Sequence, residues 1–329
     1  MNISKSISFT RITSWLSGLS VLAALALHGA IASAEEVPAE VRIGYQKGTP
    51  ILLLVKKQEA LEARLKKIGI NNVKWVEFQF GPPMLEALGA GAIDIGAVGD
   101  TPPVFAQAGG VNLVYFSATS PAEHAVLVPE NSTIKTLADL KGKRIALGKG
   151  SSAHNVFIKT LAIAGLTLKD VEPVYLGPAD ATAAFNSAKV DAWVVWDTYF
   201  SIAQEHYNAR VLLDTTDKRL ASAGFYLAHA DFAHKYPQTL TTIAQEIGVV
   251  THWAGQHRSA LAQIAAQATG IDVKSWEQSF ARQSFNYGPL SDAQVDQQQK
   301  LADTFHSLGI IPKEIHIRDI VWNWTPVKK

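Results

Sequence analysis

The sequence predicts an α/β fold made of two β/α units, each with a largely parallel sheet covered by helices. Three observations support this prediction. Short apolar runs alternate with helix-length segments from residue 41 to 116 and again from 124 to 228. Several of these runs end in a turn rich in Gly, Ser, Thr or Asp, where a helix can begin. Beyond Pro237 the pattern is almost entirely helical. Regular alternation of strands and helices is typical of parallel sheets.

The size and composition of the chain are typical of a well-packed soluble protein. It has 329 residues, which suits one large or two medium domains. Hydrophobic residues make up 47% and charged residues 18%, which argues against a disordered chain. The formal net charge is only +1, so no nucleic-acid partner is expected. Cysteine is absent, which excludes disulfides, a thiol nucleophile and a lipid-carrying cysteine.

Residues 1–34 have the pattern of a secretory signal peptide. Lys5 and Arg11 are the only charges, and Ala32-Ser33-Ala34 supplies the small residues of a cleavage site after an apolar run. An uncleaved membrane anchor is the alternative, but the apolar run is short and interrupted by polar residues. Cleavage leaves 28 basic and 29 acidic residues, a net charge of −1. We therefore expect a soluble protein exported to the periplasm and not inserted in the membrane after cleavage.

The first unit is predicted from the alternation of apolar runs and helix signals. Thr49-Pro50 supplies an N-cap and a first-turn proline, and Gly69 supplies a helix end. Glycines likewise bound the two shorter helices that follow. The predicted strands are 41–45, 73–80, 93–98 and 111–116, and the predicted helices are 51–68, 84–88 and a third one from Thr101 to Gly109.

The second unit repeats the same rhythm after a pause near Ser120-Pro121. The predicted strands are 124–128, 143–147, 173–176, 190–196, 211–212 and 224–228, and the helices are 153–164, 178–185 and one that starts at Asp197-Thr198. A long amphipathic helix follows at 240–268, with Gly255 as a candidate break. Ser291 and Gln294 form a capping box before a helix that runs to Leu308.

Four strand-to-helix junctions carry the residues of a candidate binding site. Ligands of open α/β sheets bind beyond the carboxyl ends of the strands. Two of the junctions fall in each unit, so they line one cleft if the two units face each other. They are Gln46-Lys47-Gly48-Thr49, Gly99-Asp100-Thr101, Gly150-Ser151-Ser152 and Trp196-Asp197-Thr198.

These junctions suit a small anion. The first N–H groups of a helix have no partner within the helix, and the helix dipole adds partial positive charge there. The N–H groups of Thr101, Ser152 and Ala153 can converge on one anion, Gln46 can donate from its amide, and Trp196 can form an apolar wall. An ordinary capped helix remains the alternative at each junction taken alone.

Two aspartates stand beside this expected anion site. Asp100 and Asp197 either cap the helices that follow them or bind a donor group on the ligand, and capping is the commoner role. No arginine lies in these turns. The lack of an arginine suits a strongly acidic anion, such as a sulfonate, which is always ionised near neutral pH and needs hydrogen-bond donors rather than a proton partner.

With these residues in view, the chain resembles the aliphatic sulfonate-binding proteins of bacterial ABC importers, which are relatives of the taurine and nitrate binders. The matching motifs run in family order from about residue 40 to 325. They are Gly44-Tyr45-Gln46-Lys47-Gly48, Gly81-Pro82 with Met84-Leu85-Glu86-Ala87-Leu88, Gly99-Asp100 with Pro102-Pro103, Asp139-Leu140-Lys141-Gly142, Lys149-Gly150-Ser151-Ser152 with His154-Asn155, Pro178-Ala179-Asp180, and Val190-Asp191-Ala192-Trp193 with Trp196-Asp197.

The resemblance implies a type II periplasmic binding protein with two α/β lobes, a hinge and an interlobe cleft. Lobe I would comprise residues 35–122 and 229–329, and lobe II residues 123–228. It also implies a monomer that delivers an alkanesulfonate to a membrane permease coupled to a cytoplasmic ATPase, with no cofactor. The family's binding positions carry over to Gln46, Gly99, Asp100, Thr101, Ser151, Ser152, His154, Trp196 and Asp197.

Two departures from the family pattern affect this expectation. Thr198 stands where proline is usual after Trp-Asp. The segment 119–123 is shorter than the family pattern has it, and it should lie near the crossover between the lobes. This departure bears on the size of the ligand.

Catalysis, metal binding and the binding of other anions are the alternatives to sulfonate binding. Enzymes that cleave C–S bonds occur on this fold, but a desulfinase of this type uses a cysteine, which this chain lacks. His154 with Ser151 or Ser152 would be a base and nucleophile without an evident third residue, so no catalytic residue is predicted. The histidines show no metal-binding motif, so no metal is expected. Taurine, nitrate or another small organic anion stays open as the ligand, as does a sensor role.

Overall fold

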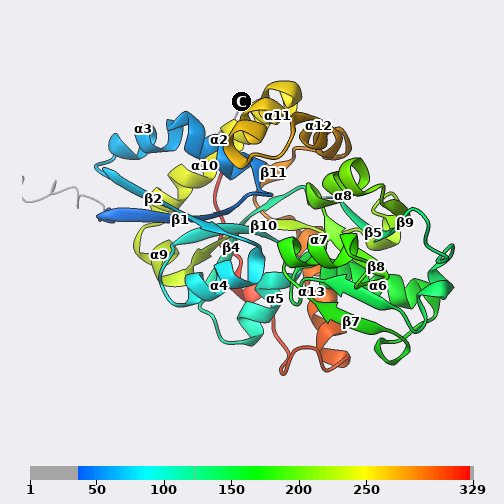
Figure 1. The fold of residues 1–329 in the computed structure, drawn as a ribbon. Coiled ribbons are helices and arrows are strands. Elements are labelled where there is room, and N and C mark those ends of the chain that lie inside the picture. The colour runs from blue at the N-terminus through cyan, green and yellow to red at the C-terminus, as the bar shows by residue number, and fades with distance from the viewer. Residues whose placement is uncertain (1–35, 122, 327–329) are drawn as a thin grey trace, which may run out of the picture. The chain divides into compact units, whose positions relative to one another are not determined.

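Two β-sheets form the framework of the computed structural model, which describes residues 36–121 and 123–326 (Figure 1). The first sheet has six strands in the order β11-β4-β10-β3-β1-β2, with bounds β1 Glu40–Gln46, β2 Asn72–Phe78, β3 Ile95–Gly99, β4 Leu113–Thr119, β10 Gly224–His229 and β11 Tyr287–Gly288. The second has five in the order β7-β6-β8-β5-β9, with bounds β5 His124–Val128, β6 Arg144–Leu147, β7 Glu172–Tyr175, β8 Ala192–Trp196 and β9 Arg210–Asp214. The predicted α/β class is confirmed.

Each sheet combines parallel pairs with antiparallel strands. β1 runs parallel to β2 and β3, and β6 runs parallel to β7 and β8. β5 pairs antiparallel with β8 and β9, and β10 pairs antiparallel with β3 and β4. The placement of β10 corrects the expectation that residues 224–228 belong to the second unit. The chain returns to the first sheet before Gly224, so β10 fills the gap between β3 and β4.

Helices cover both faces of the first sheet and bury a separate apolar cluster on each. One cluster includes Leu54, Leu240 and Trp276, and the other includes Met84 and Phe305. The helices that contribute are α2 Pro50–Gln58, α3 Ala60–Lys66, α9 Ala230–Lys235, α10 Pro237–Gln256, α11 Arg258–Thr269 and α12 Val273–Arg282 for the first cluster, and α4 Gly81–Gly89, α5 Thr101–Ala108 and α13 Asp292–Ser307 for the second.

The second sheet has its own core. Trp193 of β8 and Phe157 are almost fully buried against neighbouring apolar side chains of that sheet and its helices. The helices are α6 Ser152–Ala164, α7 Pro178–Asn186 and α8 Tyr199–Tyr207. The described residues from Val37 onward nevertheless form one compact unit by their contacts. The division into lobes at 35–122 with 229–329 and at 123–228 stays a prediction.

Two long predicted helices are each divided in the structure. The expected helix 51–68 is α2 and α3, because Glu59 between them adopts a left-handed conformation with φ 52°. The expected helix 240–268 is α10 and α11, which part at His257 and not at Gly255. Gly255 instead allows close packing, since a Cβ there would lie 3.2 Å from Cβ of Phe285. The capping box before α13 is confirmed by the bonds between Ser291 and Gln294.

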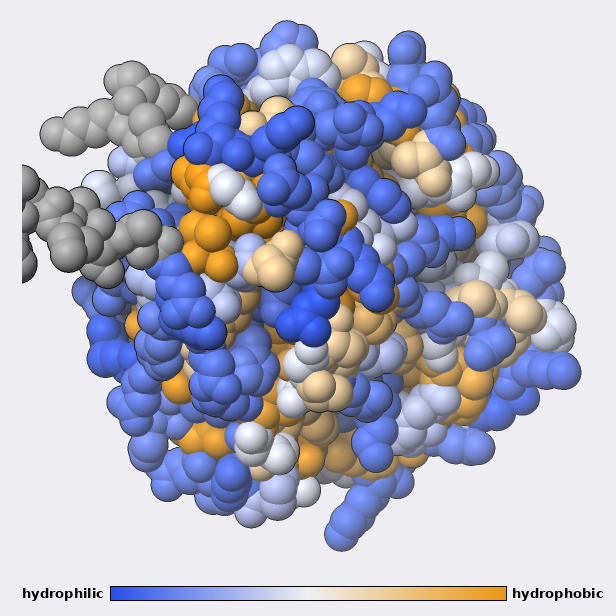
Figure 2. All heavy atoms as spheres, turned by 90° about the vertical axis from the view of Figure 1, so that its left-hand side faces the viewer, coloured by the Kyte–Doolittle hydropathy of each residue, from blue (hydrophilic) through white to orange (hydrophobic). Residues whose placement is uncertain are grey.

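The expected signal peptide, residues 1–34, lies outside the described residues. Within the described part, no helix is both long and apolar enough to span a bilayer. Figure 2 views the molecule from the left-hand side of Figure 1, where α3, α9 and β2 lie, and shows a mostly hydrophilic face with smaller hydrophobic patches.

Candidate functional site

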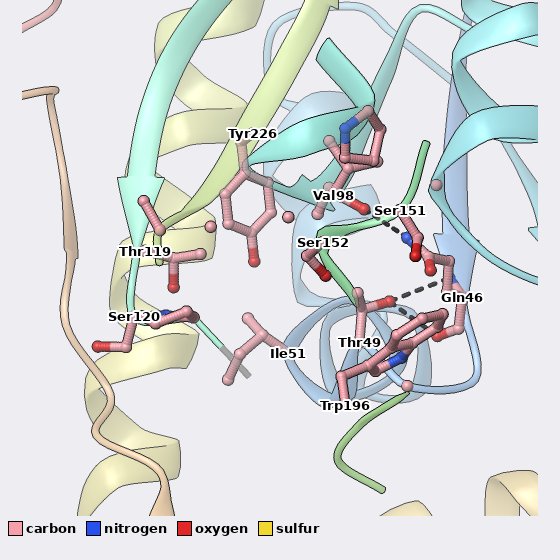
Figure 3. A pocket seen from close by; sticks show the side chains of 18 of the residues that line it. Gln46, Thr49, Ile51, Val98, Thr119, Ser120, Ser151, Ser152, Trp196 and Tyr226 are labelled. Atoms are coloured by element: carbon pink, nitrogen blue, oxygen red, sulfur yellow. Dashed lines mark hydrogen bonds between the residues drawn. The ribbon is translucent and has the colours of Figure 1, made fainter. Parts of the chain in front are cut away.

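A cavity of about 100 Å³ lies where the carboxyl ends of β1, β3, β6 and β8 meet (Figure 3). Its walls come from both sheets, as the junction pattern predicts. Gln46, Thr49 and Trp196 lie on one side, Thr119 and Tyr226 lie on the other, and Ser152 lies between them (Figure 3). The remaining lining residues are Gly48, Pro50, Ile51, Gly81, Ala97, Val98, Gly99, Pro102, Ser120, Pro121, His124, Ser151, Ala223, Gly224 and Gln283.

Five of the nine predicted site residues line this cavity. They are Gln46, Gly99, Ser151, Ser152 and Trp196. The other four do not line it, and each of them has other partners in the structure. They are Asp100, Thr101, His154 and Asp197.

The beginnings of four helices surround the cavity. Pro50 starts α2, Gly81 starts α4, Pro102 lies in the first turn of α5, and Ser152 starts α6. Each helix start carries partial positive charge, so the four together favour an anion. None of the lining residues is Asp, Glu, Lys or Arg, so no charged side chain of the lining competes with this field.

Of these four helices, α6 has the most N–H groups to offer. The first turns of α2, α4 and α5 contain prolines, which have no N–H. α6 has none, so the N–H groups of Ser152 and Ala153 belong to an uninterrupted first turn, where no partner exists within the helix. Gly150, at φ +72°, provides the left-handed turn that brings β6 into this helix start.

The structure separates the two serines that the sequence pattern grouped together. Ser151 Oγ donates to Gly148 O at 2.7 Å, so its hydroxyl proton is used inside the turn. Ser152 Oγ lies 2.8 Å from Nε2 of His124, and this hydroxyl points into the cavity in Figure 3. Ser152 is therefore the better placed of the two to donate to a ligand.

Gly99 makes room for Ser152. A Cβ on Gly99 would lie 2.7 Å from Cβ and 2.9 Å from Oγ of Ser152, closer than such atoms approach. The glycine thus allows a strand end of the first sheet to approach a helix start of the second. Gly48 lies beside Trp196, where an added Cβ would be 3.6 Å from Nε1, an ordinary van der Waals distance.

Gln46 and Trp196 form different parts of the same wall of the cavity. Gln46 Nε2 donates to Ala97 O at 2.8 Å, which fixes the amide but leaves its second N–H for a ligand. Trp196 is 9% exposed, and its ring packs edge-to-face on Tyr199 with centroids 6.0 Å apart. One face of the cavity is therefore a rigid aromatic surface.

Asp100 points away from the cavity into the interface between α5 and α6. Its Oδ2 accepts from Asn155 Nδ2 at 2.7 Å, and its Oδ1 accepts from Thr101 Oγ1 at 2.9 Å. Complete burial raises the pKa of this carboxyl, opposed in part by Lys159 and by these hydrogen bonds. Thr101 is fully buried beside it. Both residues hold the junction together and do not line the cavity.

Asp197 also points away, toward α12. Its two carboxylate oxygens accept from Nε and Nη2 of Arg282, both at 2.9 Å. Oδ1 accepts as well from the backbone N–H of Ser201, at 3.1 Å, in the first turn of α8. The capping interpretation thus holds for Asp197, with an arginine that the local sequence does not indicate.

His154 is enclosed by aromatic rings. Phe105 stacks on it with centroids 6.0 Å apart, and Phe305 packs edge-on at 5.5 Å. Gly150 N donates to its Nδ1 at 3.3 Å. Burial, assisted by the charge of Lys149, lowers the pKa of His154 to about 4. A neutral, enclosed imidazole supports the packing role and not the role of a general base.

Sequence reasoning missed many residues of the cavity, and three of them are His124, Tyr226 and Gln283. His124 begins β5 and is 1% exposed, Tyr226 lies in β10, and Gln283 follows α12. A polar residue at the start of an otherwise apolar strand was the available signal for His124. Tyr226 had no signal of its own, because its strand was assigned to the wrong sheet. Among the described residues, no cluster of His, Asp or Glu could hold a metal ion.

Comparison with known proteins places the chain in a family. A family model described as NMT1/THI5 like matches residues 73–258. A relative from Escherichia coli (strain K12) that carries the name of an aliphatic sulfonates-binding protein is 39% identical over 301 residues, covering 90% of this chain and 92% of the relative.

Solved structures show the same fold. The alkanesulfonate-binding protein SsuA from Xanthomonas axonopodis pv. citri, bound to MOPS, superposes with a TM-score of 0.82 at 38% identity, covering 87% of this chain and 99% of that one. The desulfurization enzyme DszB is a more distant neighbour, with a TM-score of 0.63 at 15% identity and coverage of 86% and 96%, which is a likeness of fold alone. The chain therefore belongs to the NMT1/THI5-like family and, within it, to the group of aliphatic sulfonate-binding proteins.

Proposed function

We propose that the protein captures aliphatic sulfonates in this cavity and delivers them to an ABC permease in the membrane. The observation that carries the proposal is the uncharged cavity at the start of four helices, with the free first turn of α6 on its wall. Such a site stabilises an anion through N–H groups and dipoles alone.

The head group would bind at α6. The N–H and hydroxyl of Ser152 and the second amide N–H of Gln46 belong to residues that line one part of the cavity. The N–H of Ala153 follows in the same first turn of α6. Each hydrogen bond to an ionised group contributes roughly 1.5–3 kcal/mol. A sulfonate offers three equivalent oxygens and stays ionised, so it can use several of these donors at once.

The rest of the cavity suits an uncharged organic tail. Ile51, Val98 and Trp196 provide apolar surface next to the donors. No carboxylate lines the cavity, so the ammonium group of taurine would lack a partner. Bare nitrate would leave the apolar walls unused. An alkanesulfonate therefore fits the lining better than either alternative.

The location and partner follow from the relatives. The structural neighbours bind alkanesulfonates, and a protein of this group works outside the cytoplasm. Residues 1–34 supply the expected export signal, so we place the mature protein in the periplasm. A ligand that contacts residues of both sheets would favour the closed arrangement of the two lobes, which a permease can recognise.

One observation favours an enzyme as the second candidate. The pair Ser152 Oγ and His124 Nε2, 2.8 Å apart, has the spacing of a nucleophile and its base. No acidic residue lines the cavity to support it, and Ser152 stands where the anion donors converge. We assign the pair to ligand binding, with His124 as a positioning residue for the Ser152 hydroxyl.

Calorimetric titration of residues 35–329 tests the proposal. Ethanesulfonate, a longer alkanesulfonate, taurine, sulfate and nitrate are titrated in turn, and each ligand is afterwards examined by NMR for chemical change. We expect submillimolar or tighter binding of an alkanesulfonate, weak taurine binding, no nitrate binding and unchanged ligand. Absence of binding to every sulfonate would overturn the proposal, and conversion of the ligand would favour the enzyme.

The two adjacent serines provide a matched control. Ser152→Ala removes a donor in the cavity and should weaken sulfonate binding about tenfold or more. Ser151→Ala removes a hydroxyl that serves Gly148 O, so its effect on affinity should be clearly smaller. The reverse order of effects would move the head group away from Ser152.

A further inference from the structure

A second cavity lies directly behind the first. It measures about 420 Å³ and is lined by uncharged side chains, among them Ser222, Asn286 and Gln297. Thr119, Ser120, Pro121 and Ala223 line both cavities. These four residues, called the partition here, separate the small cavity from the larger one by a single layer of chain.

The partition stands at the far end from the proposed head-group site. Gly224 pairs with Gly99 on one side and with Thr119 on the other, so Gly99 and Thr119 are two strands apart. Neighbouring strands are about 4.8 Å apart, which puts Thr119 roughly 10 Å from the strand that contacts Ser152. A tail that starts at the head-group site therefore meets the partition after a few carbons.

The partition is held in place by the segment that follows α12. Thr119 Oγ1 and the backbone N–H of Ser120 both donate to Asn286 O at 3.1 Å. Ser120 Oγ accepts from Ser284 Oγ at 3.0 Å and from Asn286 N at 3.1 Å. Four hydrogen bonds thus fix two residues, so the partition cannot move aside easily for a longer tail.

The available volume agrees with a short tail. The first cavity measures about 100 Å³, against about 420 Å³ for the cavity behind the partition.

We propose that the partition of Thr119, Ser120, Pro121 and Ala223 limits the ligand to short-chain sulfonates, and that the cavity behind it accepts the tail of a longer one when the partition is opened. This inference rests on the proposed function. The ligand class is an alkanesulfonate with a tail of a few carbons and no second charge.

Calorimetry with ethanesulfonate, butanesulfonate and octanesulfonate tests the inference on the mature chain. The native protein should bind ethanesulfonate at least tenfold more tightly than octanesulfonate. The double variant Thr119→Ala/Ala223→Gly removes side-chain atoms from the partition and should reduce this preference at least fivefold, chiefly by tighter binding of octanesulfonate. Gln297→Ala changes the lining of the outer cavity and not of the first one, so it should keep the native preference.

The outcomes separate the two proposals. A native protein that binds octanesulfonate as tightly as ethanesulfonate would overturn the inference while leaving sulfonate binding intact. An unchanged preference in the double variant, with folding verified by its thermal unfolding, would overturn it as well. If the double variant unfolds, Ala223→Gly alone replaces it. A reduction of less than twofold in its preference for ethanesulfonate over octanesulfonate would then overturn the inference. No binding of any sulfonate by the native protein would overturn the proposed function and this inference together.

Discussion

The junctions after β3 and β8 have the same local pattern but different environments. Each strand ends in a residue that lines the cavity, Gly99 in one case and Trp196 in the other, and each is followed by Asp-Thr. Both aspartates turn away from the cavity and contact the opposite half of the molecule. Asp100 bonds Asn155 of α6, beside the second sheet, and Asp197 bonds Arg282 of α12, which packs in a core of the first.

The difference lies in the kind of bond that each aspartate makes. Asp100 is completely buried with a neutral amide as its partner, so its charged form is penalised. Asp197 has a bidentate arginine, and the Arg282 side chain is still 29% exposed. The comparison teaches that an aspartate after a strand can connect two halves of a protein without touching the ligand between them. Ionisation of the aspartate should therefore stabilise the contact at β8 and weaken the one at β3.

Removing Arg282 should have the largest effect. Arg282→Ala leaves Asp197, 3% exposed in its side chain, without its counter-charge. Breaking such a pair costs about 3 kcal/mol of unfolding free energy, at the low end of the range because Arg282 is partly exposed. Urea unfolding measures the loss, and the double variant with Asp197→Ala should recover part of it. A loss below about 0.5 kcal/mol would remove the distinction between the two aspartates.

Gly99→Ala should have the next largest effect, on ligand affinity. The new methyl group would push Ser152 from its position near His124, because it would lie 2.7 Å from Cβ of Ser152. Losing one charge-assisted donor costs roughly 1.5–3 kcal/mol, or about 10- to 150-fold in the dissociation constant. Calorimetry with ethanesulfonate measures it. Native affinity in this variant would show that Ser152 does not hold the head group.

Trp196→Phe should have a smaller effect on ligand affinity than Gly99→Ala. Trp196 ends β8 as Gly99 ends β3. The substitution keeps an aromatic wall but removes apolar surface worth about 1 kcal/mol. We expect a loss of about fivefold in affinity, greater for butanesulfonate than for ethanesulfonate, since the ring faces the tail and not the head group. Equal losses for the two ligands would contradict a role for Trp196 in tail binding.

Asp100→Asn should have the smallest effect, and one that depends on pH. The native carboxyl has a pKa raised above its ordinary value of 3.8, so it holds its proton in the fold where the unfolded chain has released it. The contribution of Asp100 to the free energy of unfolding is therefore fully present below about pH 3.8, and it is lost as pH rises through the raised pKa. The asparagine cannot ionise, so the variant does not lose stability in this way as pH rises.

Thermal or urea unfolding from pH 4 to 7 gives the comparison. Near pH 4 the two proteins should differ by less than about 1 kcal/mol, because an amide can replace a neutral acid as acceptor. As pH rises, the free energy of unfolding of the variant should increase relative to that of the native protein. A difference that is constant over this range would mean that Asp100 is not penalised by its burial, and the two junctions would then be alike.

The sequence predicts the elements well where the signal is local. The start of α2 follows from its first-turn proline, that of α6 from the Gly-Ser turn before it, and that of α13 from its capping box. The alternation of strands and helices indicates the α/β class. The division of the long helices at Glu59 and His257 could not be predicted, because neither residue is a helix breaker by type. β10 was assigned to the wrong unit since its apolar run has no mark that distinguishes one sheet from the other.

For the site, the sequence by itself determined that strand ends with glycine, serine and aspartate would precede helices, and that α6 would begin without a proline. These features depend on the local backbone conformation, which residues adjacent in the sequence determine. Only the tertiary structure decided that Ser152 meets His124, that Asp100 and Asp197 turn to Asn155 and Arg282, and that the partition closes the cavity. Those partners are 28 to 85 residues apart, and a side chain chooses among such partners only after the sheets have packed.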